Sequence, residues 1–201
     1  MKILAIDPST SRTGLVYPDR SVVSLVTPKD LRGPDRLHWL REYFRLIFLV
    51  IKGQGMVVLE DYAIGASKGG SIIATCEWGG VLRLLLYEMD IPFVLVPPQA
   101  IKTYCTGKGN SGKDLVCSEL SSRTGLVFNN PDESDAYGLA ALANDYHGDP
   151  WVTMPAKWRE NAFKQVQWDN YNLRTEEVES NAKKRTRKGH GRKATPGDGG
   201  I

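Results

Sequence analysis

An apolar run that ends in an acidic residue occurs twice in this chain and constrains the fold more than any other feature. Residues 3–6 (ILAI) lead into Asp7, and residues 56–59 (MVVL) lead into Glu60. Such runs are typical of strands covered on both faces of a sheet. A carboxylate at the end of a buried strand is costly unless a cation or hydrogen bonds compensate its charge. A purely structural alternative is that Asp7 caps the turn at 8–11.

Strand and helix patterns follow one another in the order of a mixed α/β sheet. The β-branched runs at 13–17 and 21–27 are joined by a Pro-Asp-Arg turn, so we expect three antiparallel strands at the start. Residues 56–59 and 92–96 predict two further strands. Helices are expected at 34–52, 71–89, 99–104, 114–123 and 132–146. This order is similar to the ribonuclease-H-like fold: a five-stranded mixed sheet, with three antiparallel strands and then parallel additions, flanked by helices.

Changes in composition divide the chain into three parts. Residues 1–148 carry the strand and helix patterns and predict one domain with the ribonuclease-H-like order of elements. Residues 149–181 form a more polar extension with scattered aromatic residues. Residues 182–201 lack large apolar residues apart from the last one and are expected to be disordered. The net charge of +3 is uneven, because seven of the 26 Lys and Arg but only one of the 23 Asp and Glu lie in residues 183–201.

Cysteine usage and the start of the chain indicate a soluble cytoplasmic protein. The three cysteines form no C-x-x-C pair, which argues against a disulfide framework or a zinc site. Met1-Lys2 leads directly into the first strand with no signal-peptide pattern. The most apolar stretch, residues 46–51, is too short to cross a bilayer.

Two more acids, Asp132 and Asp135, lie three residues apart at the start of the last expected helix of the domain, on one face. If that helix packs its first turn against the ends of the strands at Asp7 and Glu60, four carboxylates converge. Their repulsion would raise the pKa values of the group. Two Mg²⁺ ions about 3.5–4 Å apart, with Mn²⁺ as a substitute, would relieve it, one activating a water and the other stabilising the leaving 3′ oxygen of a phosphodiester.

Three segments resemble the RuvC-type Holliday-junction resolvases: IDPSTSRTG at 6–14, VVLED at 57–61 and PDESDAYGLA at 131–140. The spacing agrees across roughly residues 1–148. The resemblance implies that the metal ligands are Asp7, Glu60, Asp132 and Asp135. It also implies a homodimer whose two sites nick opposing strands of a four-way junction. The segments after 148 are outside the usual bacterial pattern and look more like those of a phage or otherwise diverged relative.

Basic residues outside the acidic cluster are candidates for DNA contacts. By resemblance, the DNA-contacting lysines correspond to Lys102 and Lys113, and Lys108 lies with them around the Gly-rich loop TGKGNSGK at 106–113. That loop lacks the spacing of a nucleotide-binding P-loop. A basic tail adds non-specific, salt-dependent phosphate affinity. Its candidate residues are Lys183, Lys184, Arg185, Arg187 and Lys188.

Other polar and aromatic candidates have simpler interpretations. Tyr62 follows the second acidic strand end, where the family places a junction-stacking aromatic slightly later; it either substitutes for that residue or packs inside. Asp61 and Glu133 are expected to face solvent or to support the cluster. His147 lies at a helix C-terminus, where a histidine interacts favourably with the helix dipole.

The sequence therefore predicts a magnesium-dependent endonuclease that resolves Holliday junctions or other branched DNA in recombination or repair. A ribonuclease H acting on RNA–DNA hybrid has the same metal site and differs only in substrate. A non-catalytic junction-binding protein would keep the fold without the chemistry. An actin-like phosphotransferase would need a second domain and a second phosphate loop, and this chain has neither.

Overall fold

The computed structural model describes residues 1–62 and 70–169, which lie in one compact unit, Met1–Tyr171. The predicted basic tail, residues 182–201, falls outside the described residues. Five strands form a single sheet in the order β3-β2-β1-β4-β5. Their bounds are β1 Lys2–Asp7, β2 Arg12–Val16, β3 Val22–Val26, β4 Gly55–Glu60 and β5 Phe93–Val96.

The strand pairing confirms the predicted mixed sheet. β1 pairs with β2 and β2 with β3 in antiparallel fashion, whereas β4 and β5 are added in parallel on the other side of β1. β1 is therefore the central strand, and its residues Ile3 to Ile6 are fully buried. This burial on both faces is the physical reason for the uninterrupted apolar run in the sequence.

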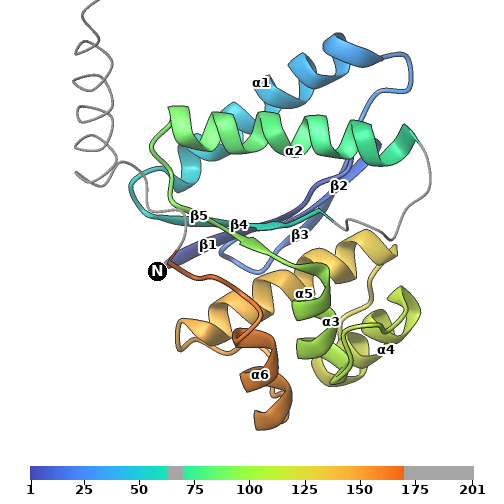
Figure 1. The fold of residues 1–201 in the computed structure, drawn as a ribbon, viewed down its shortest axis with the longest axis vertical. Coiled ribbons are helices and arrows are strands. Elements are labelled where there is room, and N and C mark those ends of the chain that lie inside the picture. Colours follow the sequence, from blue (N-terminus) through green and yellow to red (C-terminus); the bar gives the residue numbers. More distant parts are fainter. Residues whose placement is uncertain (63–69, 170–201) are drawn as a thin grey trace, which may run out of the picture. The chain divides into compact units, whose positions relative to one another are not determined.

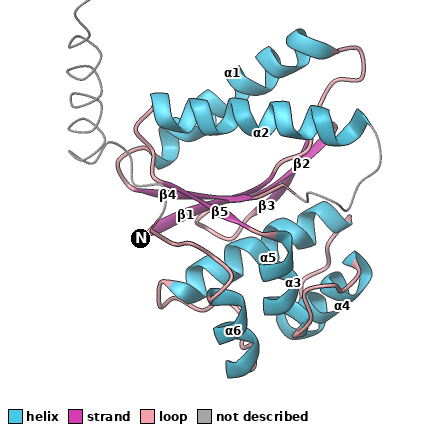
Figure 2. Cartoon of the chain, viewed as in Figure 1, coloured by secondary structure: helices cyan, strands magenta, loops and turns pink. Residues whose placement is uncertain are grey.

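Helices cover both faces of the sheet (Figures 1 and 2). Two of them, α1 and α2, lie on one face, and the other four, α3 to α6, lie on the opposite face (Figure 1). Their bounds are α1 Gly33–Ile51, α2 Gly70–Glu88, α3 Pro98–Thr106, α4 Lys113–Thr124, α5 Pro131–Tyr146 and α6 Ala156–Phe163. The strands alternate between the two layers, so that Leu4 and Ile6 pack under α1 and α2, while Ile3 and Ala5 pack under α5.

Small residues let α5 lie very close to the sheet. Ala136, Ala140 and Ala143 are completely buried on this helix. On the sheet side, Gly14 of β2 pairs with Asp7 of β1, and a Cβ atom at Gly14 would lie 2.5 Å from the backbone oxygen of Asp132. The glycine after Thr13 therefore permits the first turn of α5 to reach the end of β1, where the candidate catalytic acids lie.

The described part of the predicted extension, residues 149–169, shares the core of the first 148 residues. Val152, Met154, Ala162 and Val166 belong to the same buried cluster as α5. An ion pair between the buried Asp145 and the partly exposed Arg159 holds α6 in place. The Arg159 guanidinium donates to Asp145 at 2.5 and 2.7 Å. Tyr104 of α3 also donates to Asp145, at 3.1 Å. The division of the chain at residue 148 remains a prediction.

The sequence placed the helices within a few residues, with two informative details. α3 extends to Thr106, two residues beyond its predicted end, and stops at Gly107, which has the left-handed φ of 79°. α2 continues through Gly79 and Gly80, and Gly79 leaves space for the ring of Tyr62. Among the described helices, none is both long and apolar enough to span a membrane.

We expect Gly14→Ala to destabilise the protein by about 1–3 kcal/mol, because the new methyl group would collide with the backbone of Asp132. Gly80→Ala is the matched control: its Cβ would meet no atom within 4 Å, and replacing a helical glycine gains about 0.5–1 kcal/mol. Urea denaturation of both variants measures the difference. A Gly14→Ala protein as stable as wild type would show that α5 does not depend on this close approach.

Candidate active site

Asp7 and Glu60 lie at the carboxyl ends of two neighbouring parallel strands. Ile6 of β1 is in register with Leu59 of β4, so the two acids follow at the same edge of the sheet. Both side chains are only partly exposed, and each carboxyl group influences the pKa of the other. A shared proton or a bound cation would relieve the repulsion between two neighbouring acidic groups.

The first turn of α5 brings Asp132 and Asp135 to this edge. Asn130 caps the helix by accepting a hydrogen bond from the backbone N–H of Glu133 at 3.1 Å. The carboxylate of Glu133 accepts hydrogen bonds from the backbone of Asn129 at 2.8 Å and from Ser24 of β3 at 3.1 Å. This network joins the start of α5 to the sheet and so orients the two aspartates.

From the sequence, Glu133 is expected either to face solvent or to support the cluster. The structure shows that it is buried and that it supports the cluster by fixing the start of α5. The residue is 7% exposed, and its hydrogen bonds go to the loop before α5 and to β3. A signal for this was present in the sequence, because N-x-x-E at 130–133 is a variant of the capping box. The further contact with Ser24, more than 100 residues away, could not be read from local spacing.

Lys113, the first residue of α4, contributes the positive charge closest to the acids. Its ammonium group lies 2.8 Å from Asp135 and 3.3 Å from Asp132. Partial burial alone would lower the pKa of Lys113, but the hydrogen bond and attraction to Asp135 raise it above its usual value. One ammonium group thus faces four carboxyl groups.

The positive charge near the acids does not balance their negative charge, and the pKa values of three of them are raised. Burial, with repulsion from Asp135 and Asp132, raises the pKa of Asp7 to about 6, against the effect of the hydrogen bond from Glu60. Burial and the charge of Asp7 raise the pKa of Glu60 well above its ordinary value. Burial also raises the pKa of Asp135, although Lys113 opposes the rise. Near neutral pH the cluster would gain from a further cation.

The donor set fits a hard divalent cation, since carboxylate oxygens are the ligands that Mg²⁺ prefers. Within residues 1–62 and 70–169, however, no three acidic, histidine or cysteine side chains form a ready-made cation site. The ammonium group of Lys113 pairs with two of the four acids and neutralises charge that a metal ion would otherwise neutralise. A metal that bridges the two strand ends and α5 would therefore compete with this lysine.

The remaining predicted DNA-contacting lysines lie nearby. Lys102 of α3 is half-buried, and its charge lowers the pKa of Asp135 slightly against the effect of burial. Lys108 is exposed in the Gly-rich loop, whose shape is fixed by the hydroxyl of Thr106, hydrogen-bonded to Ser111 at 2.7 Å and to the carbonyl of Lys108 at 3.1 Å. The predicted tail contacts, Lys183, Lys184, Arg185, Arg187 and Lys188, lie outside the described residues.

Tyr62 packs against α2. Its hydroxyl donates to the carbonyl of Cys76 at 2.9 Å, the guanidinium of Arg83 lies 4.2 Å from the ring centre, and Gly79 leaves room for the ring. Arg83 also pairs with Asp61 at 3.0 Å, so Asp61 belongs to this packing rather than to the four-acid cluster. A stacking role for Tyr62 in DNA binding stays a prediction, and it would require the ring to leave these contacts.

Comparisons with known proteins support the predicted resemblance. A RuvC crossover junction endodeoxyribonuclease of Nocardia farcinica is 28% identical over 152 residues, covering 71% of this chain and 79% of the relative. One of Syntrophomonas wolfei is 27% identical over 150 residues, covering 70% and 86%. No family model matches the chain.

A solved structure has the same fold. The structure described as Thermus thermophilus RuvC in complex with Holliday junction substrate superimposes with a TM-score of 0.59 at 15% identity, covering 77% of this chain and 99% of that one. The ribonuclease-H-like fold predicted from the element order is thereby confirmed. The low identity limits this comparison to the fold.

In metal-free buffer we expect the free energy of unfolding to fall as the pH rises from about 4 to about 6 and above. The folded protein keeps protons on Asp7 and Glu60 that the unfolded chain has already released in this range, so the unfolded state gains with rising pH. In Asp7→Asn, the free energy of unfolding should fall by about 1–3 kcal/mol less over this pH range, because Asn does not ionise. Urea denaturation in EDTA at several pH values checks it. Parallel pH curves for wild type and variant would contradict the proposed charge shortage.

We expect Lys113→Gln to bind Mg²⁺ about three- to tenfold more tightly than wild type, because the ammonium group no longer competes for Asp135 and Asp132. Calorimetric titration with Mg²⁺ measures the affinity. Lys157→Gln, an exposed lysine of α6, is the control and leaves the affinity unchanged. Weaker Mg²⁺ binding by Lys113→Gln would mean that this lysine supports the metal site instead of competing with it.

Proposed function

We propose that this chain, a diverged relative of the RuvC crossover junction endodeoxyribonucleases in sequence and fold, is a metal-dependent endonuclease that cleaves branched DNA and resolves four-way junctions. The observation that carries the proposal is the gathering of four acids at one edge of the sheet, with the pKa of Asp7 raised to about 6. A structural role alone does not explain so much like charge in one place, because each buried carboxylate lowers stability.

In this proposal Asp7, Glu60, Asp132 and Asp135 hold Mg²⁺, two ions in each site. When bound, the ions supply the charge that activates a water molecule and that stabilises the leaving 3′ oxygen of a phosphodiester. Asp7 and Glu60 are fixed by the two central parallel strands. Asp132 and Asp135 are fixed by the capped first turn of α5. The chain thus contributes a rigid set of oxygen ligands and needs no nucleophilic side chain.

The lysines around the cluster have a second task, which is to bind the DNA backbone. Lys113 is half-exposed, so its ammonium group can pair with a phosphate once a metal ion neutralises Asp132 and Asp135. Lys102 of α3 acts on Asp135 through its charge, and Lys108 is exposed in the loop after α3. The basic residues at 183–193 add salt-dependent affinity that does not depend on sequence.

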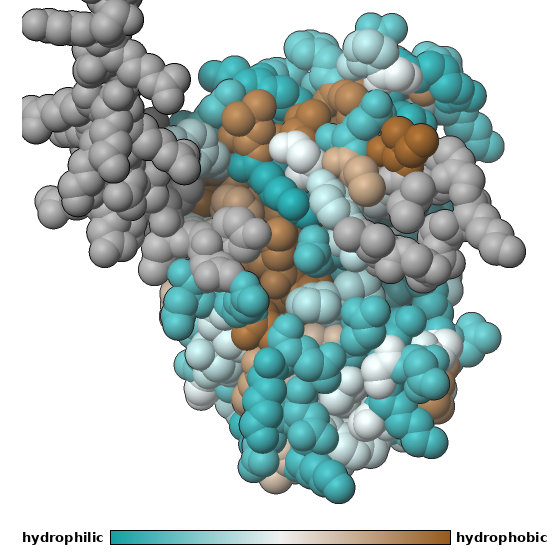
Figure 3. Space-filling view, in the orientation of Figure 1, coloured by the Kyte–Doolittle hydropathy of each residue, from teal (hydrophilic) through white to brown (hydrophobic). Residues whose placement is uncertain are grey.

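Resolution of a junction needs two cuts, and we propose that two copies of the chain provide them. The outer face of α1 and α2 exposes large apolar side chains, as the brown patches over these helices in Figure 3 indicate. They are Leu46, Leu49, Val50, Ile73, Leu84 and Tyr87. An exposed apolar patch of this kind on a soluble domain is a candidate interface. We assign it to a second copy because a dimer would supply the second cut.

Ribonuclease H activity on an RNA–DNA hybrid is the second candidate. The same four-acid edge supports it, because the ligand set is the same for both substrates. We favour DNA, since the curated relatives that match over 70% of the chain are named as endodeoxyribonucleases. A junction-binding protein without catalysis would not need four mutually repelling acids at one place.

Cleavage of a synthetic four-way junction tests the proposal, beside linear duplex, a flap and an RNA–DNA hybrid, each in Mg²⁺ and in EDTA. We expect paired, symmetric nicks on the junction that disappear in EDTA. Asp7→Asn and Glu60→Gln should each reduce the rate by about 100-fold or more, since even residues that only support metal ligands contribute about 10–100-fold.

Glu119→Gln is the matched control, because this acid of α4 pairs with Arg123 away from the cluster; it should cut the junction like wild type. Cleavage of the hybrid alone would make the protein a ribonuclease. Tight junction binding without any cleavage would retire the enzymatic proposal. Single, unpaired nicks would contradict the dimer.

A further inference from the structure

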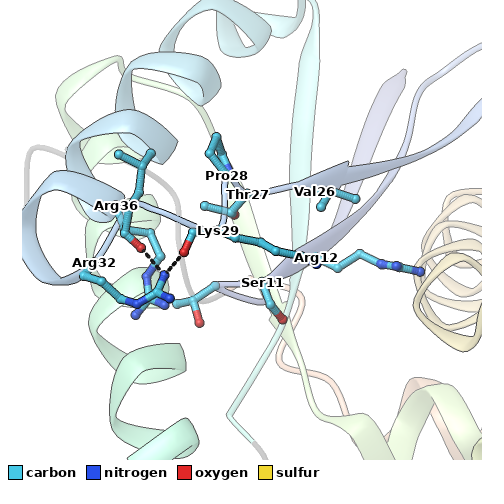
Figure 4. A pocket seen from close by; sticks show the side chains of 10 residues that line it. Ser11, Arg12, Val26, Thr27, Pro28, Lys29, Arg32 and Arg36 are labelled. Carbon is cyan, nitrogen blue, oxygen red and sulfur yellow. Dashed lines mark hydrogen bonds between the residues drawn. The ribbon is translucent and has the colours of Figure 1, made fainter.

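A pocket separate from the four acids lies beyond the turn that follows Asp7, on the side of α1. It is formed by the loop between β1 and β2, the end of β3, the segment 27–32 and the first turn of α1. Its cavity volume is about 380 Å³, within the range of small-ligand sites. Figure 4 shows Arg32 and Arg36 on the α1 side of this pocket and Ser11 on the strand side. None of the four acids lines it.

The pocket carries a concentrated positive charge. Four of its ten lining residues are basic, and none is acidic. The four are Arg12, Lys29, Arg32 and Arg36. Within the described part of the chain, no ion pair joins any of them to a carboxylate, although Asp30 and Asp35 are close in sequence. Arg32 and Arg36 lie together on the α1 side, whereas the Arg12 side chain extends away from them (Figure 4). Like charges repel one another, so unpaired cations along one cavity favour an anion there.

Hydrogen-bonding groups in the pocket also lack partners. The hydroxyl of Thr27 and the Nε of Arg36 are buried and have no hydrogen-bond partner among the described residues. Thr27 itself is only 5% exposed. Buried polar groups are normally satisfied, so each exception calls for a partner. An anion with several oxygen atoms would supply acceptors for both groups after a small rearrangement.

The guanidinium of Arg32 is held in place by the backbone. Its Nη1 donates to the carbonyl of Leu31 at 2.8 Å and to that of Lys29 (Figure 4). A guanidinium has five N–H donors, so this anchoring leaves others for a ligand. Arginine is the residue best suited to bidentate binding of phosphate. The pocket therefore has the chemistry of a phosphate site built on a fixed arginine.

The position of the pocket relates it to the four-acid cluster. The segment Pro8 to Ser11 joins Asp7 directly to the pocket wall, and the hydroxyl of Thr13 closes this turn by donating to the carbonyl of Ser9 at 2.7 Å. β3, which carries Thr27 just past its end, lies two strands from β1. Ser24 of β3 is level with Asp7 through Gly14 of β2, so two strand spacings and three residues along β3 place Thr27 about 14 Å from Asp7. This distance corresponds to a few nucleotides of one DNA strand.

We propose that this basic pocket binds a backbone phosphate of the DNA substrate, a few nucleotides from the bond that the four-acid cluster cuts, and so positions the strand across the end of the sheet. The inference rests on the proposed function for its choice of partner. The pocket would read no base sequence, because phosphate contacts fix register and orientation only. Arg32 and Arg36 are thus positioning residues, outside the catalytic cluster.

The test is the affinity for a four-way junction in EDTA, where no cleavage occurs, as a function of salt concentration. The double variant R32Q/R36Q should bind about tenfold more weakly, and the slope of log Kd against log salt should fall by about one unit, because about 0.9 counterion is released for each phosphate contact. The single variant R32Q should show part of the change. Circular dichroism and thermal melting verify that each variant is folded.

The control is R45Q, which removes a charge from the same helix outside the pocket, where Arg45 pairs with Glu42 at 3.7 Å; it should leave the slope unchanged. Wild-type affinity and slope in the folded R32Q/R36Q variant would overturn the proposal even if wild type cleaves junctions. If wild type cleaves none of the substrates but R32Q/R36Q still shows the reduced slope, the phosphate-binding pocket is supported and the proposed nuclease function is wrong.

Titration of wild type with inorganic phosphate and with a nucleoside monophosphate separates the two sources of phosphate. Weak, millimolar binding of both, lost in R32Q/R36Q together with the change in DNA slope, supports a backbone site. Tight nucleotide binding that the variant loses while its DNA slope stays unchanged would overturn the DNA proposal and assign the pocket to a free nucleotide.

Discussion

Repulsion among carboxyl groups at one edge of the sheet is the constraint on which the rest of the structure depends. Asp7 and Glu60 are brought together by two central parallel strands, and Asp132 and Asp135 are added by the first turn of α5. Among the described residues, the ammonium group of Lys113 pairs directly with Asp132 and Asp135, and the charge of Lys102 acts on Asp135 as well. The central position of β1, the glycine that admits α5 and the capped start of that helix all act to hold these charges together against a force that separates them.

Much of this arrangement could be predicted from the sequence, because it rests on local patterns. Apolar runs ending in Asp7 and Glu60 mark buried strands, and the spacing of Asp132 and Asp135 places both on one helix face. Contacts between distant segments could not be predicted. The bond from Ser24 to Glu133, the ion pair of Asp145 with Arg159 and the packing of Tyr62 against Gly79 each join residues that no short-range periodicity relates.

The end of the sheet combines opposite charges on its two sides. On the side of α5, four acids require a cation; on the side of α1, four basic residues around a cavity favour an anion. The short turn between β1 and β2 separates them. A nucleic-acid strand carries phosphates at regular spacing and would satisfy both sides at once, if one phosphate lay at the four acids with a bound cation and another lay at the arginines. This pairing of charges links the fold to a nuclease function more directly than either side alone.

A crystal structure with Mn²⁺, which scatters anomalously and has the ligand preferences of Mg²⁺, would show whether the four acids bind a metal ion. We expect an anomalous peak between the carboxylates of Asp7, Glu60 and Asp135, with the ammonium group of Lys113 moved away from its present position 2.8 Å from Asp135. If no peak is present there at saturating Mn²⁺ and Lys113 is still paired to Asp135, the lysine is the permanent partner of these acids and they do not form a metal site.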